Sequence, residues 1–282
     1  MTNKDVYQKV TDKVLELIEQ GTMPWQLTWT NGLPINGISK KNYRGINIWL
    51  LGQSAMLNKF TSNVWLTYKQ VSILGGQVIK GSKSTFVTFS SKIEKSNDKD
   101  GEKDVNTFWI FRYYNVFNLD QTTGIEKKFE SRILTDNEII QDAENMVNGY
   151  NDKPAIVNGL NPCYIPIRDE VQVPNIEKFT NSQEYYAALF HELVHSTGSE
   201  KRLKRDITNS FGDELYSKEE MIAEFGASYL NALTGITTEA TEQNSASYID
   251  GWSKKIKKDP AIIMRSASKA MRAVDYMQGL IK

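Results

Sequence analysis

The chain has 282 residues, of which 40% are hydrophobic and 24% are charged, so it is long enough to bury the cores of two small domains. Its 34 lysines and arginines balance 34 aspartates and glutamates, and the single cysteine, Cys163, excludes an intrachain disulfide and suits a reducing compartment. The sequence has no apolar signal core after Met1 and no run of about 18 apolar residues, so we expect a cytoplasmic protein without a membrane partner.

The N-terminal half is predicted to begin with an amphipathic helix over residues 4–19, which ends before Gly21. The further elements expected in this half are short helices near residues 47–57 and 67–74 and strands near residues 85–89 and 107–116. The stretch 92–104 between the two strands is rich in charged residues, and it is predicted to be a solvated, mobile hairpin tip.

The two halves of the chain differ in charge. Residues 1–120 carry 15 lysines and arginines against 10 acids, whereas residues 121–282 carry 19 against 24. In the basic half the cations alternate with aromatic residues, a mixture that can follow a phosphate backbone while rings stack on unpaired bases. The candidate DNA-binding residues are Lys40, Lys41, Tyr43, Arg44, Trp49, Trp65, Tyr68, Lys69, Lys80, Lys83, Arg112 and Tyr113. Alternating aromatics are also typical of one face of a packed β-strand, which is an alternative interpretation of the same pattern.

The C-terminal half is expected to begin with a helix over residues 136–150. Three short strands should follow, at residues 155–157, 163–167 and 170–173, and the segment 163–173 is the natural edge at which a peptide can add as a further strand. A helix from Asn181 to just before Gly198 comes next, and a last amphipathic helix is predicted from Pro260 to about Leu280.

Residues 191–195 read His-Glu-Leu-Val-His and lie within the helix that Asn181 opens. Two imidazoles four residues apart project from one helical face and can bind a single metal ion. Glu192 is offset around the helix, so it can act as a general base on a metal-bound water without being a ligand. His191 and His195 are the only two histidines of the chain, which makes chance a poor explanation for their spacing. The pattern predicts a hydrolase that uses Zn²⁺, with Mn²⁺ or another divalent ion as an alternative.

A catalytic zinc ion has three protein ligands and one open position, so a third ligand is needed. A second helical pattern, residues 217–230, offers Glu220 and Glu224 on one face. Its Glu-x-x-Ala-Glu spacing resembles the Glu-x-x-Ser-Asp element of thermolysin-like gluzincins, which implies Glu220 as the ligand and Glu224 as the residue that orients a histidine. Alignment with the Glu-Gly-Phe-Ala element of zinc aminopeptidases makes Glu224 the ligand instead, and Ser217 with Glu220 also fits a capping box. Tyr216, just before this pattern, is our candidate for stabilising an oxyanion.

Further motifs occur in both halves of the chain. They are Tyr43-Arg-Gly-Ile-Asn47-Ile-Trp-Leu-Leu51, Trp65-Leu-Thr-Tyr68-Lys69-Gln, Gly75-Gly-Gln-Val-Ile-Lys80-Gly81, His191-Glu-Leu-Val-His195-Ser-Thr-Gly198, Arg202-Leu203, Phe211-Gly212 and Glu220-Met-Ile-Ala-Glu224. In this order, and over nearly the whole chain, they resemble the ArdC-type antirestriction proteins.

The resemblance implies an α+β protein with two domains. Residues 1–130 correspond to a domain that binds single-stranded DNA, and residues 131–282 to a zincin-like, gluzincin-type metallopeptidase domain with one zinc ion. Proteins of this type are carried by conjugative plasmids, integrative elements or phages and protect incoming DNA from host restriction. The chain departs from the pattern at Ser196, where we expect an aromatic residue, and at Ser199, where a histidine is common. Because Ser199 cannot supply this additional imidazole, the resemblance implies more firmly that the third metal ligand is an acidic residue.

Three functions remain open on the sequence alone. The first is a zinc peptidase tethered to DNA, with a host restriction protein or another DNA-bound protein as its substrate. The second is a protein that coats or occludes single-stranded DNA and whose metal site is structural or inactive. The third is a peptidase or toxin whose basic half recognises a protein.

Overall fold

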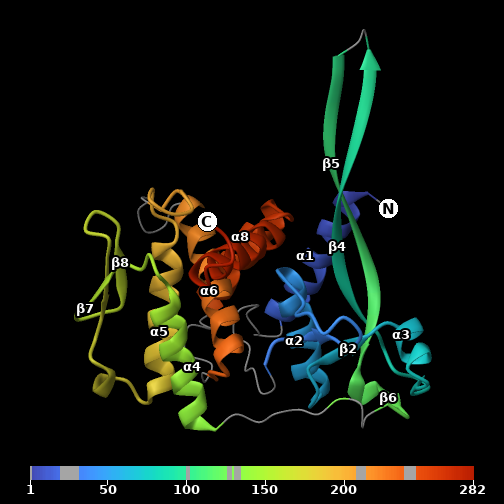
Figure 1. Ribbon diagram of the computed structural model, residues 1–282, viewed down its shortest axis with the longest axis horizontal. Coiled ribbons are helices and arrows are strands. Elements are labelled where there is room, and N and C mark those ends of the chain that lie inside the picture. Colours follow the sequence, from blue (N-terminus) through green and yellow to red (C-terminus); the bar gives the residue numbers. More distant parts are fainter. Residues whose placement is uncertain are drawn as a thin grey trace.

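The structure is a computed structural model that describes residues 2–19, 32–99, 102–125, 129, 135–207, 214–237 and 246–282. Within these ranges it leaves out the side chains of residues 93–99, 102–108, 137, 214–217 and 246–250. The fold is α+β, as predicted, with a β-sheet in each half of the chain and helices between the two sheets (Figure 1).

The N-terminal half arranges three helices around a four-stranded sheet. Its elements are α1 (Asn3–Glu19), β1 (Ile35–Asn36), α2 (Ile46–Asn58), β2 (Val64–Leu66), α3 (Tyr68–Ile73), β3 (Gln77–Val78), β4 (Thr85–Lys99), β5 (Glu102–Asn118) and β6 (Thr122–Thr123). The sheet order is β1-β2-β5-β4, with β1 parallel to β2 and the other neighbours antiparallel, and β3 pairs separately with β6. Thr67 and Gln70 form a reciprocal capping box that fixes the start of α3. The three predicted helices of this half are confirmed.

The hairpin of β4 and β5 is longer than the sequence indicated. The predicted hairpin is present, but most of the stretch 92–104 that was expected to form its solvated, mobile tip belongs to the strands, because the antiparallel register continues from the pair Thr85 and Val116 to the pair Lys99 and Glu102. The outer part of the hairpin projects away from the rest of the molecule (Figure 1). A two-stranded arm of this kind has no buried face, so its strands can be polar on both sides and lack the alternation by which half-buried strands are recognised.

In its described part, the C-terminal half packs a small sheet and five α-helices around the metal motif. Its elements are α4 (Asp136–Gly149), β7 (Ala155–Asn158), β8 (Cys163–Ile165), β9 (Glu170–Val173), α5 (Ser182–Ser196), α6 (Glu214–Thr234), α7 (Ala246–Lys258) and α8 (Ile262–Met277). The sheet order is β7-β9-β8, so β8 lies at an edge, and α5 packs beside α6. The sequence analysis missed α7, although its apolar residues Trp252 and Ile256 are one turn apart and buried.

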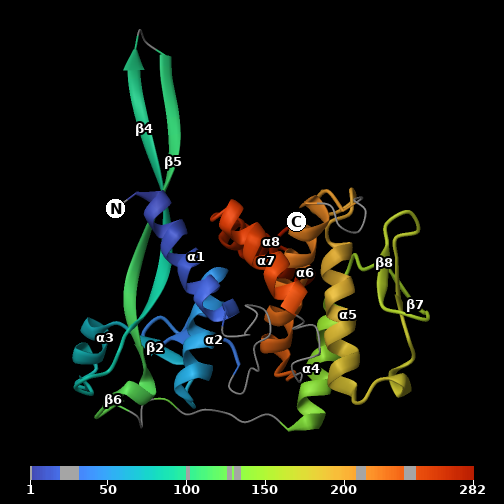
Figure 2. The same cartoon turned by 180° about the vertical axis from the view of Figure 1, so that it is seen from behind.

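The two halves share one hydrophobic core. Buried side chains of α1 and α2 belong to the same cluster as those of α5, α6 and α8, and the helices of both halves lie against one another (Figure 2). Among the described residues, hydrogen bonds join the halves from Thr11 Oγ1 to the carbonyl of Pro260 at 2.7 Å, from the Tyr229 hydroxyl to the carbonyl of Gly45 at 3.0 Å, and from the Arg44 guanidinium to the Asp275 carboxylate. The predicted domain boundary at residue 130 lies outside the described residues. None of the helices in the described part of the chain is long and apolar enough to cross a membrane.

Candidate metal centre

A well-defined helix, α5, holds His191 and His195. The side chain of Asn181 caps this helix by accepting a hydrogen bond from the N–H of Glu184 at 2.9 Å. At the other end the N–H of Gly198 donates to the carbonyl of His195 at 2.8 Å. The predicted start and end of the metal-motif helix are therefore confirmed, and the two imidazoles stand one turn apart on a rigid element.

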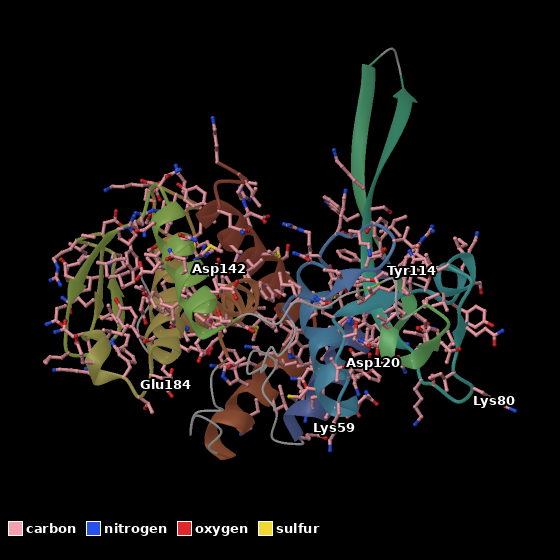
Figure 3. The ribbon with its side chains drawn as sticks, turned by 60° about the horizontal axis from the view of Figure 1, so that its bottom comes forward. Lys59, Lys80, Tyr114, Asp120, Asp142 and Glu184 are labelled. Atoms are coloured by element: carbon pink, nitrogen blue, oxygen red, sulfur yellow. The ribbon has the colours of Figure 1, made fainter. Side chains whose placement is uncertain are left out.

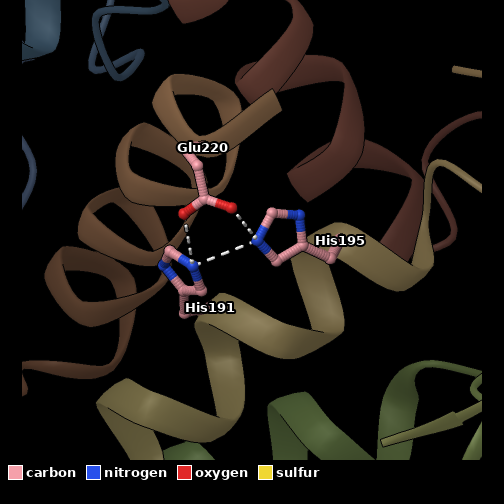
Figure 4. A group of neighbouring side chains, drawn as sticks. All are labelled: His191, His195 and Glu220. Carbon is pink, nitrogen blue, oxygen red and sulfur yellow. Dashed lines mark hydrogen bonds and ion pairs between the residues drawn. The ribbon is translucent and has the colours of Figure 1, made fainter. Parts of the chain in front are cut away.

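The two imidazoles converge with the carboxylate of Glu220, which comes from α6 (Figure 4). The Nε2 atoms of His191 and His195 are 3.1 Å apart. Glu220 Oε2 lies 3.6 Å from His191 Nε2, and its Oε1 lies 3.4 Å from His195 Nε2. All three ligand atoms lie within 4.8 Å of one another, an arrangement found once among the described residues. Two imidazole nitrogens and one carboxylate are the donor set of the His₂Glu zinc sites of hydrolases.

Glu224, the alternative third ligand, lies one turn further along α6 and does not belong to this group. Burial raises the pKa of its carboxyl, and the nearby imidazole of His191 opposes this effect. The expected capping box of Ser217 and Glu220 is wrong, because α6 already begins at Glu214 and Ser217 lies inside the helix. The backbone of Tyr216 lies in the first turn of α6, and its side chain is outside the described part. The geometry thus favours Glu220 over Glu224 as the third ligand.

Close packing of α5 on α6 sets the distance between the ligands. Val194, which precedes His195, lies directly against Gly226 of α6: a Cβ atom added to Gly226 would stand 2.7 Å from both Cγ atoms of Val194. Only glycine leaves room for this approach. The small residue therefore lets α6 bring Glu220 within reach of the imidazoles.

Glu219 and Arg205 complete the surroundings of His195, and the sequence analysis missed both. Glu219 Oε1 lies 3.4 Å from His195 Nδ1, the nitrogen that faces away from Glu220. Arg205 holds Glu219 through two hydrogen bonds, from Nε at 2.9 Å and from Nη2 at 2.7 Å. The same guanidinium donates to Thr197 Oγ1 and to the carbonyl of Val194, so it ties the end of α5 to α6. By its position, Glu219 rather than Glu224 is the residue that can orient a ligand histidine.

The charges of this cluster depend strongly on one another. Burial lowers the pKa of His195, but hydrogen bonds with Glu219 and Glu220 outweigh this effect and raise the pKa to about 10. Burial also opposes the charged form of His191, and the hydrogen bond with Glu220 still raises its pKa. Burial raises the pKa of Glu220, but the two imidazoles outweigh burial and hold that pKa below its ordinary value. A metal ion that binds here must therefore displace protons.

The three ligand side chains line a cleft of about 350 Å³. Glu192 is only 9% exposed and lines this cleft beside the histidines. The lining also includes Cys163 and Tyr164 of β8, the edge strand. The structure therefore places a strand edge next to the metal motif, but only β8 lies at that edge, whereas β9, the rest of the predicted segment 163–173, is the central strand of the sheet.

A second buried arginine holds β8 in this position. Arg202, whose side chain is 1% exposed, donates to both carboxylate oxygens of Asp169, at 2.7 Å and 3.0 Å. Asp169 lies in the turn between β8 and β9, and Arg202 also donates to the carbonyl of Ser196 at the end of α5. The sheet turn is thereby fixed to the helix that carries the histidines.

The structure corrects part of the predicted DNA-binding set. Trp49 and Trp65 are 0% and 1% exposed, so these rings belong to the core and cannot stack on bases. Tyr43 and Tyr113 are half-buried, and the ammonium of Lys9 covers the ring of Tyr113 at 4.1 Å. Alternation in the sequence does not distinguish these packed rings from free ones.

The other candidates of the basic half are exposed. They are Lys40, Lys41, Arg44, Tyr68, Lys69, Lys80, Lys83 and Arg112. Lys40 lies over the ring of Phe129 at 4.1 Å, and Arg44 forms an ion pair with Asp275. Figure 3 shows Lys80 and Tyr114 at the surface of the N-terminal half.

Among the hairpin residues whose side chains the structure describes, three exposed rings were missed, and one of them is Trp109 of β5, which is 55% exposed. Phe89 of β4 and Tyr114 of β5 are 54% and 46% exposed, and their centroids are 6.3 Å apart. Arg112 is paired with Phe89 in the register, so both side chains and that of Tyr114 share one face. An exposed cation beside two exposed rings is the combination that single-strand binders use. The sequence contained part of this signal, because Arg112 and Tyr114 are two residues apart and therefore lie on the same face of a strand.

Comparisons with known proteins agree with this layout. A family model described as the N-terminal domain of anti-restriction factor ArdC matches residues 4–117, and one described as a zincin-like metallopeptidase matches residues 141–269. The uncharacterized protein y4eC of Sinorhizobium fredii is 30% identical over 98% of this chain and 92% of its own length. A DNA primase TraC of Escherichia coli is 31% identical over 97% of this chain, which spans only 20% of that primase.

Two solved structures are similar to the chain over 97% of its length. The metal-free structure of the antirestriction ArdC protein from plasmid R388 has a TM-score of 0.79 and 32% sequence identity, with 97% of that chain covered. The Mn(II)-bound structure of the same protein has a TM-score of 0.76 and 31% identity, again with 97% covered. On this evidence the chain belongs to the ArdC family of antirestriction proteins, with a zincin-like metallopeptidase domain in its C-terminal half.

Proposed function

We propose that this protein protects DNA that enters a cell on a mobile element, and that it does so as a single-stranded-DNA-binding protein with a zinc-dependent peptidase site. One observation carries the proposal: His191, His195 and Glu220 converge beside Glu192 in an open cleft. The chain that holds this cleft belongs to an antirestriction family, and its other half carries exposed cations and rings.

His191, His195 and Glu220 would hold the metal ion. Their two nitrogens and one carboxylate suit Zn²⁺, and the cleft beside them leaves room for a fourth ligand. The Mn(II)-bound form of the R388 protein supports a divalent ion here as well. When bound, zinc polarises a carbonyl group and lowers the pKa of water to about 7.

Glu192 and the strand β8 would do the remaining work of peptide hydrolysis. The Glu192 carboxylate accepts the proton of the attacking water and returns it to the leaving amine. A substrate peptide can add to the edge of β8 beside Cys163, which orients the scissile bond across the cleft. Tyr216 remains our candidate for donating a hydrogen bond to the developing oxyanion.

Single-stranded DNA would bind to the N-terminal half, in the proposed division into residues 1–130 and 131–282. Arg112, Lys69, Lys80 and Lys83 supply exposed charge, and Tyr68, which is 64% exposed, joins the hairpin rings as a stacking surface. Bound DNA brings the cleft close to proteins on the same DNA. A restriction protein or another DNA-bound protein is therefore the proposed peptidase substrate.

Protection of unmodified DNA in a restricting host tests this function. Cells that express the wild type, Glu192→Gln or His195→Ala receive unmodified and modified plasmid DNA by conjugation, and transconjugants are counted. We expect the wild type to raise the recovery of unmodified DNA and both variants to lose this effect. Equal protection by wild type and Glu192→Gln, at matched protein levels, would contradict the peptidase part of the proposal. No protection by the wild type would contradict the whole.

A further inference from the structure

A second cleft, of about 520 Å³, lies between the hairpin and α8 and is separate from the metal cleft. Its walls come from the start of α2, the middle of β4, Phe111 of β5, and one face of α8. It therefore joins the two halves of the chain. Neither the metal motif nor the proposed peptide hydrolysis uses it.

Among the described residues, no strand pairs with the outer edge of β4 where that edge enters this cleft. β4 is the last strand of its sheet, and Asn47 of α2 covers one position of its outer edge. The Asn47 side chain accepts from the N–H of Thr88 at 2.7 Å and donates to the carbonyl of Thr88 at 2.7 Å. Because backbone groups alternate in direction along an antiparallel strand, the N–H and C=O of Ser90 point the same way, beyond Asn47. Ser90 lines the cleft and offers these groups to a ligand.

The charge at the cleft is positive. Arg44 and Arg272 both line it, and Asp275 is the single acid among its lining residues. Asp275 forms an ion pair with Arg44, and its side chain is only 12% exposed while that of Arg44 is 58% exposed. Asp275 therefore holds the Arg44 guanidinium at the cleft, and the exposed Arg272 from α8 adds a second positive charge that forms no ion pair with the described residues. Guanidinium groups bind phosphate through paired hydrogen bonds.

An exposed ring continues the cleft onto the hairpin. Phe89 lines the cleft and is 54% exposed, although burial of such a ring is favourable. Tyr114 stands next to it, with ring centroids 6.3 Å apart at an angle of 71°. The guanidinium groups that line the cleft can bind phosphate, and the exposed rings of the hairpin next to the cleft can stack on bases.

We propose that this cleft holds a segment of single-stranded DNA, with a phosphate between Arg44 and Arg272 and a base on Phe89. The inference rests on the proposed DNA binding and adds that the binding surface is shared: α8 of the zincin-like half contributes Arg272. DNA in the cleft contacts both halves at once. An extended peptide on the outer edge of β4 is the competing occupant, and it requires neither guanidinium.

The test uses the full chain and a fluorescein-labelled 20-mer of oligo-dT, with binding followed by fluorescence anisotropy at several salt concentrations. Arg272→Ala removes the charge from α8. Lys269→Ala is the matched control, because Lys269 is exposed on the same helix but does not line the cleft. Phe89→Ala removes the ring. Thermal unfolding of each variant verifies that the fold is kept.

We expect Arg272→Ala to weaken binding at least about tenfold and to reduce the slope of log K against log salt by about 0.7, the loss of one phosphate contact. Lys269→Ala should change affinity less than about twofold. Phe89→Ala should weaken binding at least about fivefold with an unchanged salt slope, since stacking releases no counterions. Arg272→Lys should restore the slope and part of the affinity.

Two results would overturn the inference in different ways. If the wild type binds the oligonucleotide and Arg272→Ala matches Lys269→Ala in affinity and slope, the cleft is not part of the DNA surface, while DNA binding by the hairpin and its cations stands. If the wild type does not bind, the DNA-binding part of the proposed function fails, and this inference fails with it.

Discussion

Arg205 donates two hydrogen bonds to the carboxylate of Glu219, and both side chains are almost fully buried, at 8% and 7% exposed. Glu219 in turn faces His195 Nδ1 at 3.4 Å, on the side of the ring opposite Glu220. The guanidinium keeps the pKa of the Glu219 carboxyl low against the effect of burial. Once a metal ion has displaced the proton on Nε2, a charged, fixed carboxylate holds the Nδ1 proton of the neutral imidazole and orients Nε2 toward the ion.

This relationship predicts that Arg205→Gln weakens metal binding without touching a ligand. We expect the affinity for Zn²⁺, measured by competition with a chromophoric chelator, to fall by about 10–100-fold. We expect the Zn²⁺ affinity of Glu219→Gln to fall by a similar factor, because the neutral amide no longer holds the imidazole proton.

Arg202→Gln is the control for the loss of a buried arginine. It breaks a comparable bidentate pair, with Asp169, whose contact fixes the sheet turn rather than Glu219. It should lower the thermal unfolding temperature as Arg205→Gln does while changing zinc affinity much less. If both arginine variants lose zinc equally, general destabilisation rather than orientation of His195 explains the effect.

The choice of third ligand gives a second prediction. Glu220→Gln should abolish stoichiometric zinc binding after dialysis, because two imidazoles alone do not hold the ion against buffer. Glu224→Gln should keep about one zinc ion per chain, since its carboxyl lies outside the ligand group. Metal content by atomic emission measures both. If Glu224→Gln loses zinc and Glu220→Gln keeps it, Glu224 is the third ligand.

Packing of α5 on α6 gives a third prediction. Gly226→Ala places a methyl group 2.7 Å from the Cγ atoms of Val194, so the helices must separate. We expect a loss of about 1–3 kcal/mol of unfolding free energy in urea and a weaker zinc site, because Glu220 moves away from the histidines. Gly251→Ala in α7 is the matched control: nothing lies within 4 Å of the added Cβ, and alanine should stabilise this helix by up to about 1 kcal/mol. Equal effects of the two substitutions contradict the packing argument.

Acid sensitivity gives a fourth prediction, through Asp169. The hydrogen bond from Arg202 holds the pKa of Asp169 below its ordinary value, with burial opposing. A depressed pKa stabilises the folded state above the unfolded pKa of about 3.9, and this contribution is lost as pH falls through the lower folded value. In a chelator, the wild type should therefore lose more thermal stability than Asp169→Asn between pH 5 and pH 3. If the wild type and Asp169→Asn lose the same thermal stability over this pH range, the pair of Arg202 and Asp169 does not stabilise the fold.

The ligand histidines could be predicted because a helix fixes their relation locally. Spacing of four residues, a cap at Asn181 and a glycine at position 198 are all visible in the sequence, and the structure contains this helix. Glu219 and Arg205 could not be predicted in the same way. Arg205 comes from a loop, and its contact with Glu219 depends on how that loop crosses α6, which no periodic pattern encodes.

The rings of the N-terminal half show a second limit. Aromatic alternation is typical of β5, yet it does not reveal which face of a strand another element covers. Trp65 is buried within its cluster while Phe89 is half exposed, although both lie on strands of the same sheet. Burial is decided by tertiary packing, so the stacking surface had to come from the structure.

Anomalous diffraction from crystals of the full chain grown with one equivalent of Zn²⁺ tests the central claim most directly. We predict a single strong peak at the zinc edge, about 2.0–2.2 Å from His191 Nε2, His195 Nε2 and a carboxylate oxygen of Glu220, with Glu192 beside the ion but not bound to it. A peak ligated by Glu192 or Glu224, or no peak between the two histidines, would contradict the account.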